Sequence, residues 1–156
     1  MIPNFKMSES FYFSEMIKTS HEDLALENME RSVPFVFNMT ILCRYALDEA
    51  RKTIGLPLLV GSGFRCEALN SMVGGGANSK HKEGLAADVV FPGITLETAI
   101  NEGRKVVARY AELGFNIDVV VENKMGKVWL HIEHDIEGPR LWVSTEKGYV
   151  QEAQTT

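Results

Sequence analysis

The spacing of apolar residues changes along this chain, and the change limits the folds available to it. Between residues 36 and 54, and again between 96 and 113, apolar residues recur at helical spacing. Segments 116–122, 127–135 and 140–144 instead show the alternating or continuous apolar pattern of strands. Helices that come first and strands that come last indicate an α+β protein, with a small antiparallel sheet and helices packed on one side.

Two short apolar segments upstream, residues 58–60 and 85–91, are also expected to be strands. The intervening segment 62–73 predicts a helix, and it stops at the glycine run 74–76 because glycine favours helix ends. The sheet is therefore expected to draw strands from the middle of the chain as well as from its last third.

The composition is that of an ordinary globular protein, with 45% hydrophobic and 24% charged residues in a chain of 156. No repeat or linker divides it, so we expect one monomeric domain over residues 1–150 and a loose tail over 151–156. The net charge of -5 argues against nucleic acid as a partner. No segment approaches the ~20 apolar residues that membrane insertion requires.

The cysteine content and the first residues exclude two further classes. Cys43 and Cys66 are too few for a disulfide scaffold or a four-thiolate zinc site, so histidine and carboxylate must supply most ligands of any zinc ion. The first 16 residues lack a basic segment followed by an apolar run, so no signal peptide is visible. We therefore expect synthesis in the cytoplasm.

Asp88 is a carboxylate inside an apolar strand, since residues 89–91 are Val-Val-Phe. Its burial without a partner would cost several kcal/mol, so Asp88 must be hydrogen-bonded, ion-paired or bound to a metal. His81 lies seven residues earlier, in a polar loop next to glycine. This spacing leaves a metal site and a structural carboxylate both open.

The strand predicted over 127–135 adds a second histidine to this pattern. Alternation places three aliphatic residues on the core face and Trp129, His131 and Glu133 on the other. His134 is the second choice as a ligand, because alternation puts it on the core side. Two histidines and an aspartate with one open position are typical of catalytic zinc sites, where the metal lowers the pKa of water to ~7.

A general base is expected near that water. If residues 124–127 form the loop of a hairpin, Glu122 and His131 become diagonal neighbours on one face. Glu122 is therefore the first candidate, followed by Glu133 and Asp118. The alternative is that Glu122 is a strand-end carboxylate beside a lysine of the loop.

Arg65 and Ser79 are candidates for binding substrate. The guanidinium of Arg65 could hold a carboxylate or stabilise an oxyanion, because it pairs with planar anions through two hydrogen bonds. An ion pair with Glu67 or another acid is the competing interpretation. Ser79, two residues before His81, could hydrogen-bond substrate or simply end the loop.

These residues resemble the signature of zinc D-alanyl-D-alanine carboxypeptidases and their phage endolysin relatives, over roughly residues 8–135. In that family S-G-[FY]-R precedes S-x-H-x-x-G-x-A-x-D, and a W-x-H element closes the site. The matching residues here are Ser62, Gly63, Phe64, Arg65, Ser79, His81, Gly84, Ala86, Asp88, Trp129 and His131. The three-part match is specific, much more so than any one part.

The resemblance implies a Hedgehog/DD-peptidase-like fold and a Zn²⁺ site made by His81, Asp88 and His131. It also implies that Arg65 lies near substrate and that a carboxylate activates the water. The substrates of the family are peptidoglycan stem peptides, cut beside D-alanine or at an L-Ala-D-Glu bond. Residues 1–150 would then be one zinc peptidase domain.

One position departs from the family pattern. Several members carry the acidic base three residues before the last histidine, where this chain has Val128. Glu122 fits the arrangement of one subfamily and would replace it. A non-catalytic, zinc-containing module that binds peptidoglycan is the alternative that Val128 suggests, and a cytoplasmic D,D-dipeptidase is a third hypothesis.

Location places a further condition on the peptidase hypothesis. Peptidoglycan lies outside the membrane, while no signal peptide is visible in the sequence. Release of a cytoplasmic endolysin during phage lysis would bring the enzyme to the wall. We therefore expect an enzyme made in the cytoplasm that meets its substrate on lysis.

Overall fold

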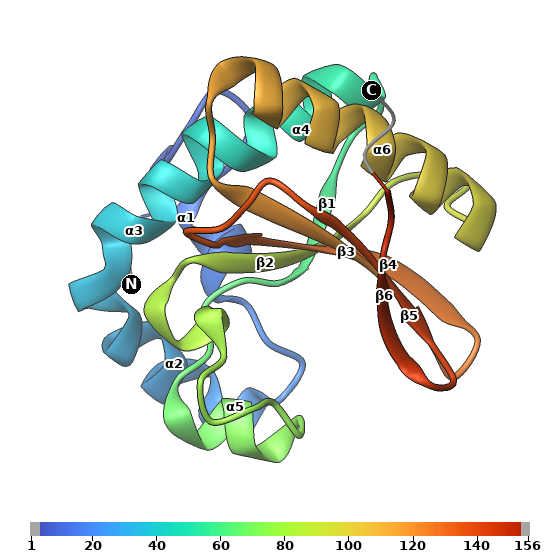
Figure 1. Ribbon diagram of the computed structural model, residues 1–156. Helices are drawn as coiled ribbons and strands as arrows, with labels where there is room; N and C mark the ends of the chain where they lie inside the picture. Colours follow the sequence, from blue (N-terminus) through green and yellow to red (C-terminus); the bar gives the residue numbers. More distant parts are fainter. Residues whose placement is uncertain (1–3, 154–156) are drawn as a thin grey trace.

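A computed structural model describes residues 4–153, and a six-stranded sheet forms its centre (Figure 1). The strand order is β1-β2-β4-β3-β5-β6. The strands are β1 (Leu59–Ser62), β2 (Ala86–Val90), β3 (Ile117–Lys124), β4 (Lys127–His134), β5 (Leu141–Thr145) and β6 (Gly148–Gln151). The expected α+β class and the five expected strands are confirmed, and β6 is an additional strand.

The sheet is antiparallel except where β5 pairs with β3. The hairpin returns the chain to the beginning of β3, because Ile117 pairs with His134 at the end of β4. The short connection that follows starts β5 at that same end, so β5 runs parallel to β3. The expected antiparallel pairing is therefore found in four of the five strand pairs, and the pair of β3 with β5 is the exception.

Helices precede most of the strands, as the spacing predicts. The helical elements are α1 (Phe13–Ile17), η1 (Glu22–Leu24), α2 (Ala25–Ser32), η2 (Val33–Phe35), α3 (Val36–Ile41), η3 (Leu42–Leu47), α4 (Asp48–Ile54), α5 (Glu67–Met72), η4 (Lys80–Glu83) and α6 (Leu96–Leu113). α3, the π-helical η3 and α4 follow one another without a break. Thr95 caps α6 by accepting a hydrogen bond from Thr98, and Gly114 ends it in the left-handed conformation.

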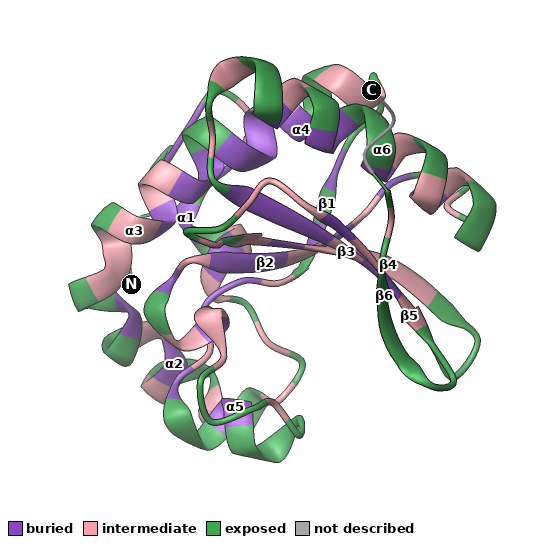
Figure 2. Ribbon diagram, viewed as in Figure 1, coloured by how far each residue is buried: buried purple, intermediate pink, exposed green. Residues whose placement is uncertain are grey.

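The main hydrophobic core lies between one face of the sheet and a helical layer formed by η3, α4 and α6 (Figures 1 and 2). Gly103 of α6 allows close packing, because an added Cβ would lie 2.9 Å from Leu141 Cδ1. The strand residues of this core are Val60, Ala87, Val89, Ile117, Val119, Val121, Leu130, Ile132, Leu141 and Val143. Their alternation along each strand leaves the opposite face of the sheet free for polar side chains.

α5 and η4 lie on the other side of the sheet, away from α4 and α6 (Figure 1). In the same view, α5 and the β5–β6 hairpin lie on opposite sides of the lower part of the molecule (Figure 1). No helix among residues 4–153 is long and apolar enough to cross a membrane.

The first two residues of the tail expected over 151–156 are paired with the sheet. Gln151 belongs to β6, and the backbone N–H of Glu152 donates to Leu141 O. The remaining residues of that segment, 154–156, lie outside the described part of the chain, as do residues 1–3 of the expected domain.

Candidate metal centre

The polar face of the sheet carries Asp88 and His131 side by side. Asp88 on β2 pairs with His131 on β4, while their neighbours Val89 and Leu130 face the core. His81 comes from η4, the 3₁₀ turn that leads into β2. His134 is exposed at the end of β4 and does not join them.

The donor atoms of these three residues converge on one point. Asp88 Oδ1 lies 2.8 Å from His131 Nδ1 and 3.3 Å from His81 Nε2. One ligand atom from each residue lies within 4.8 Å of the others. A carboxylate oxygen between two imidazole nitrogens is an arrangement that one cation can occupy.

Each imidazole has a second hydrogen bond that fixes which nitrogen faces the cluster. His81 Nδ1 lies 2.6 Å from Gly63 O, a carbonyl, so Nδ1 carries the proton and Nε2 presents its lone pair. His131 Nε2 lies 2.9 Å from Glu133 Oε2, which leaves Nδ1 toward Asp88. Such outer partners orient the histidines of metal sites.

Burial and mutual contacts shift the pKa values of all three residues of the cluster. Burial lowers the pKa of His81, against an opposing effect of Asp88. Burial acts to raise the pKa of Asp88, but the contacts of its carboxylate with His131 and His81 outweigh burial and hold that pKa well below its usual range. Burial likewise opposes the charged form of His131, yet Asp88 and Glu133 raise the pKa of His131 to about 9. The surroundings of Asp88 therefore favour its negatively charged form.

The donor set fits zinc. Zinc accepts imidazole nitrogen and carboxylate oxygen, and three protein ligands leave the fourth position that a catalytic site requires. Both cysteines are buried in the core and lie outside the cluster. The prediction that histidine and carboxylate supply the ligands therefore agrees with the chemistry of the residues that the fold brings together.

Arg65 lies against this cluster, held by two contacts. Its Nη2 donates to Asp88 Oδ2 at 2.8 Å, and its Nε donates to Ser62 Oγ at 2.8 Å. The acid that pairs with Arg65 is thus Asp88, while Glu67 pairs with Lys82. Within residues 4–153, Nη1 makes no hydrogen bond, while Nη2 and Nε are both engaged.

The loop that carries Arg65 is fixed by a buried asparagine that the sequence does not single out. Asn28 is fully buried in α2, and its Nδ2 donates to Ile17 O at 2.9 Å and to Phe64 O at 3.1 Å. Its Oδ1 accepts from the backbone N–H of Cys66 at 2.7 Å. Gly63 completes the loop, because an added Cβ would collide with the backbone of Met16.

Ser79 begins the turn that carries His81. Its Oγ accepts a hydrogen bond from the backbone N–H of His81 at 3.3 Å, so it caps η4. This contact matches the interpretation of Ser79 as a residue that ends the loop. Its own O–H donates to no acceptor in the described residues, and binding of substrate stays a prediction.

The three candidates for the general base have different surroundings. Glu133 accepts from His131, and Asp118 is held by Arg140, whose Nη2 lies 2.6 Å from Asp118 Oδ2. Glu122 is 8% exposed and contacts neither a cluster histidine nor Arg140. The hairpin register is confirmed, with Glu122 diagonal to His131 on the polar face.

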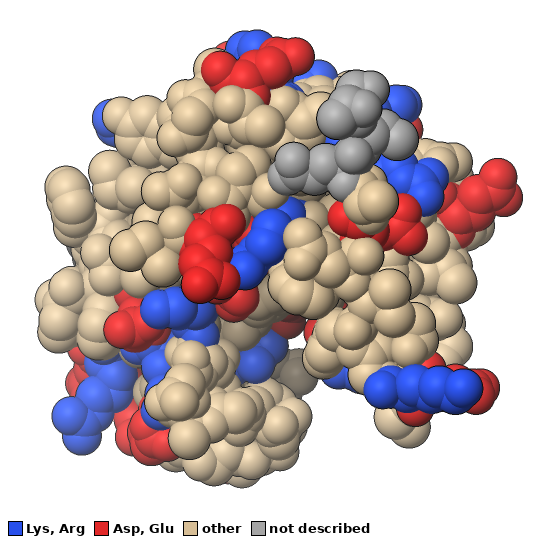
Figure 3. Space-filling model, viewed as in Figure 1, with Lys and Arg blue, Asp and Glu red and all other residues tan. Residues whose placement is uncertain are grey.

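Glu122 and His131 line the same groove, which has a volume of about 410 Å³. Its other lining residues come from β3, β4 and β5, the loop before β5, and β6: Asp118, Val120, Glu133, Asp135, Arg140, Trp142 and Tyr149. Figure 3 shows a hollow on this side, between the lobe that carries α5 and the β5–β6 hairpin. Charged side chains lie within it.

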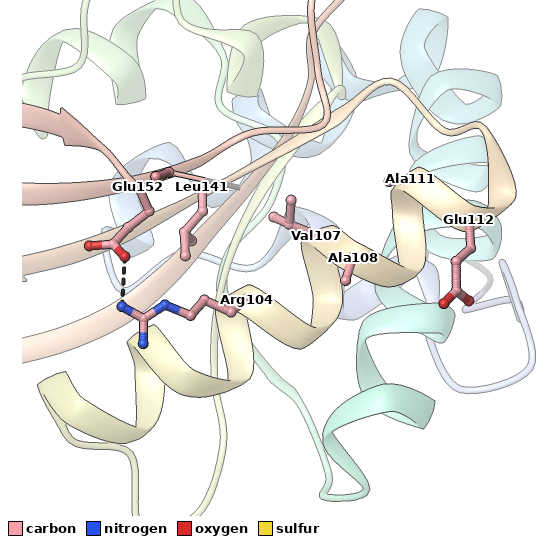
Figure 4. Close-up of a pocket in the computed structure, with 8 residues that line it drawn as sticks. Arg104, Val107, Ala108, Ala111, Glu112, Leu141 and Glu152 are labelled. Atoms are coloured by element: carbon pink, nitrogen blue, oxygen red, sulfur yellow. Dashed lines mark hydrogen bonds and ion pairs between the residues drawn. The ribbon is translucent and has the colours of Figure 1, made fainter. Parts of the chain in front are cut away.

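A second pocket lies on the opposite side of the sheet, against α6 (Figure 4). It has a volume of about 230 Å³ and apolar walls that include Val107, Ala108 and Leu141. An ion pair lies at its edge, with Arg104 Nη2 2.6 Å from Glu152 Oε2. The predicted site residues do not line this pocket, so the metal cluster and the groove beside it form the candidate active site.

Comparison with known proteins identifies one family. A model of the family Peptidase M15 matches residues 14–117, about two thirds of the chain. The matched segment includes Arg65, His81 and Asp88 and ends before Glu122 and His131. A search of curated proteins found no match. The chain therefore belongs to the peptidase M15 family of zinc-dependent metallopeptidases.

Proposed function

We propose that this protein is a zinc peptidase that hydrolyses peptidoglycan stem peptides, of the D-Ala-D-Ala carboxypeptidase or L-Ala-D-Glu endopeptidase type. The observation that carries the proposal is the convergence of His81, Asp88 and His131 beside a groove that Glu122 also lines. A metal-ligand set and a separate carboxylate on one open face are the two parts that metal-assisted hydrolysis needs.

His81, Asp88 and His131 would hold the zinc ion. When bound, zinc polarises a peptide carbonyl and makes water more acidic. Glu122 takes the proton of the attacking water and returns it to the leaving amine. Arg65 stabilises negative charge on the substrate through Nη1, while its other contacts keep Asp88 in place.

The form of the groove supports a wall peptide as the substrate. A hollow that is open to solvent between two lobes accommodates a segment of a larger molecule (Figure 3). A free dipeptide would be bound more strongly in a closed pocket that buries most of its surface. Release from the host cell during phage lysis would bring the enzyme to this substrate.

The alternative is a zinc-containing module that binds peptidoglycan without cleavage. It is motivated by Val128, which stands where several relatives carry an acid. The position of Glu122, in the groove and diagonal to His131, supports catalysis instead.

Mass spectrometry of muropeptides tests the proposal. We expect zinc-loaded protein to release new amino termini from purified peptidoglycan, chelation to abolish the products, and added zinc to restore them. The mass of the products identifies the bond, since release of D-alanine and cleavage after L-alanine differ. Protein that sediments with sacculi and yields no product would support the binding module. Turnover of free D-Ala-D-Ala without any product from sacculi would support the dipeptidase.

A further inference from the structure

Glu122 is held by two residues that come from outside the metal cluster. The hydroxyl of Tyr149 donates to Glu122 Oε1 at 2.9 Å. Lys124 Nζ lies 3.0 Å from Glu122 Oε2 and donates to the same tyrosine hydroxyl at 3.1 Å. Glu122, Lys124 and Tyr149 thus form a closed triangle, in which each residue contacts the other two.

The triangle depends on the order of strands in the sheet. β5 lies between β3, which carries Glu122, and β6, which carries Tyr149. Tyr149 pairs with Ser144 of β5. Because the side chain of Ser144 is small, the phenol can cross β5 on the polar face and reach Glu122. A tyrosine at this position serves no need of the core, since Tyr149 is 52% exposed.

The two oxygens of Glu122 are left in different states. Oε1 is occupied by the hydroxyl of Tyr149. Oε2 is buried and accepts no aligned hydrogen bond from the described residues, although the ammonium of Lys124 lies near it. The hydrogen bond with Tyr149, together with the nearby carboxylate of Glu122, raises the pKa of Lys124. Glu122 is thus fixed by a hydrogen bond at Oε1 and by an ion pair at Oε2.

We infer that Tyr149 is a positioning residue, which holds Glu122 in the orientation that catalysis uses, with Lys124 supporting both. The inference rests on the proposed function, in which Glu122 is the general base. Tyr149 acts through Glu122 and contributes neither to zinc binding nor to the core. Its effect is therefore expected on kcat, with little effect on KM or zinc content.

The test is a double-mutant cycle measured on zinc-loaded protein with purified muropeptides. Y149F removes only the hydroxyl, and with it one hydrogen bond to a charged group. We expect the loss of this hydrogen bond to lower kcat about tenfold. KM should stay within about twofold. In the background of E122Q, Y149F should lower kcat no further, because the carboxylate that Tyr149 would position is already absent.

Tyr45→Phe is the matched control. Tyr45 has a similar exposure of 48%, its ring packs on Phe115 away from the groove, and its hydroxyl makes no hydrogen bond in the described residues. We expect wild-type kcat for this variant. Wild-type kcat for Y149F, or an equal loss in both backgrounds, would overturn the inference. Wild-type kcat for E122Q would instead overturn the role of Glu122 in the proposed function.

Crystal structures give a readout that needs no turnover. In the wild-type protein we expect Glu122 in one rotamer with Oε1 bonded to Tyr149. In Y149F we expect the carboxylate to adopt another rotamer or several. An unchanged rotamer in Y149F would contradict the positioning role, whatever the substrate is.

Discussion

The two faces of β3 and β4 differ in what holds them together. On one face, Val121 and Leu130 are fully buried against the helices, and any aliphatic side chain of suitable size satisfies such a position. On the other, His131 and Glu122 each contact particular atoms of residues on other elements. The alternation of one pair of strands therefore separates stability from chemistry.

The polar face can stay partly open because its central carboxylate, Asp88, has charged and hydrogen-bonding partners. Asp88, at its centre, receives hydrogen bonds from His131 and Arg65 and lies close to His81. These partners offset the cost of burying a carboxylate that the apolar face could not offset. We therefore expect substitutions on the polar face to remove function while the fold persists, and substitutions on the apolar face to do the reverse.

The largest effect is expected for Asp88→Asn. The amide has nearly the same shape but no charge to balance a metal ion, so zinc should be lost and activity should fall by on the order of 10³-fold or more. Mass spectrometry measures the loss of zinc, turnover measures the loss of activity, and circular dichroism checks that the fold persists. Asp23→Asn is the control, because Asp23 is exposed and lies outside the site. Full zinc occupancy in Asp88→Asn would break the assignment of this face.

Glu122→Gln should separate zinc binding from catalysis on the same face. We expect zinc content to be unchanged and kcat to fall by ~10²–10⁴-fold, the usual contribution of a general base. Steady-state kinetics and metal analysis on the same sample check this, with the exposed Glu146→Gln as the matched variant. If Glu122→Gln keeps its activity, Glu133 becomes the next candidate.

Leu130→Ala tests the apolar face of the strand that carries His131. Because Leu130 is fully buried, the free energy of unfolding should fall by ~2–5 kcal/mol. Folded protein at low temperature should still bind zinc. Denaturant unfolding and zinc titration provide the two readouts, and Leu26→Ala, at an exposed position, should change little. Loss of zinc from folded Leu130→Ala would show that the two faces are not separable.

The smallest effect is expected for Tyr110→Phe, which removes one buried hydrogen bond on the apolar side of the sheet. Tyr110 of α6 is fully buried, and its hydroxyl donates to Ala46 O at 2.6 Å. Tyr110→Phe leaves that carbonyl without this partner, so unfolding should become easier by ~1–2 kcal/mol. Thermal unfolding of the two proteins measures the difference, and activity at low temperature should remain. Equal stability would mean that water replaces the phenol.

Much of the polar face could be predicted because its signals are local. An aspartate inside an apolar strand and a histidine at an alternating position of another strand each place a side chain on a face without knowledge of the fold. The length of the hairpin loop was enough to make Glu122 diagonal to His131.

The remaining features depend on contacts between distant segments. The parallel pairing of β5 follows from the path of the chain at the end of β4, and no spacing in the sequence encodes it. β6 was missed because its residues are all exposed and carry no apolar alternation. Asn28 and Tyr149 matter through partners 36 and 27 residues away, which a pattern of neighbours cannot reveal.

X-ray absorption at the zinc edge tests the central claim most directly. For the zinc-loaded protein, we expect a four-coordinate shell of nitrogen and oxygen at ~2.0–2.1 Å, with the outer scattering of two imidazoles and no sulfur. The shell should be absent from Asp88→Asn prepared in the same way. A zinc–sulfur distance near ~2.3 Å, or a shell without imidazole, would contradict a site made by His81, Asp88 and His131.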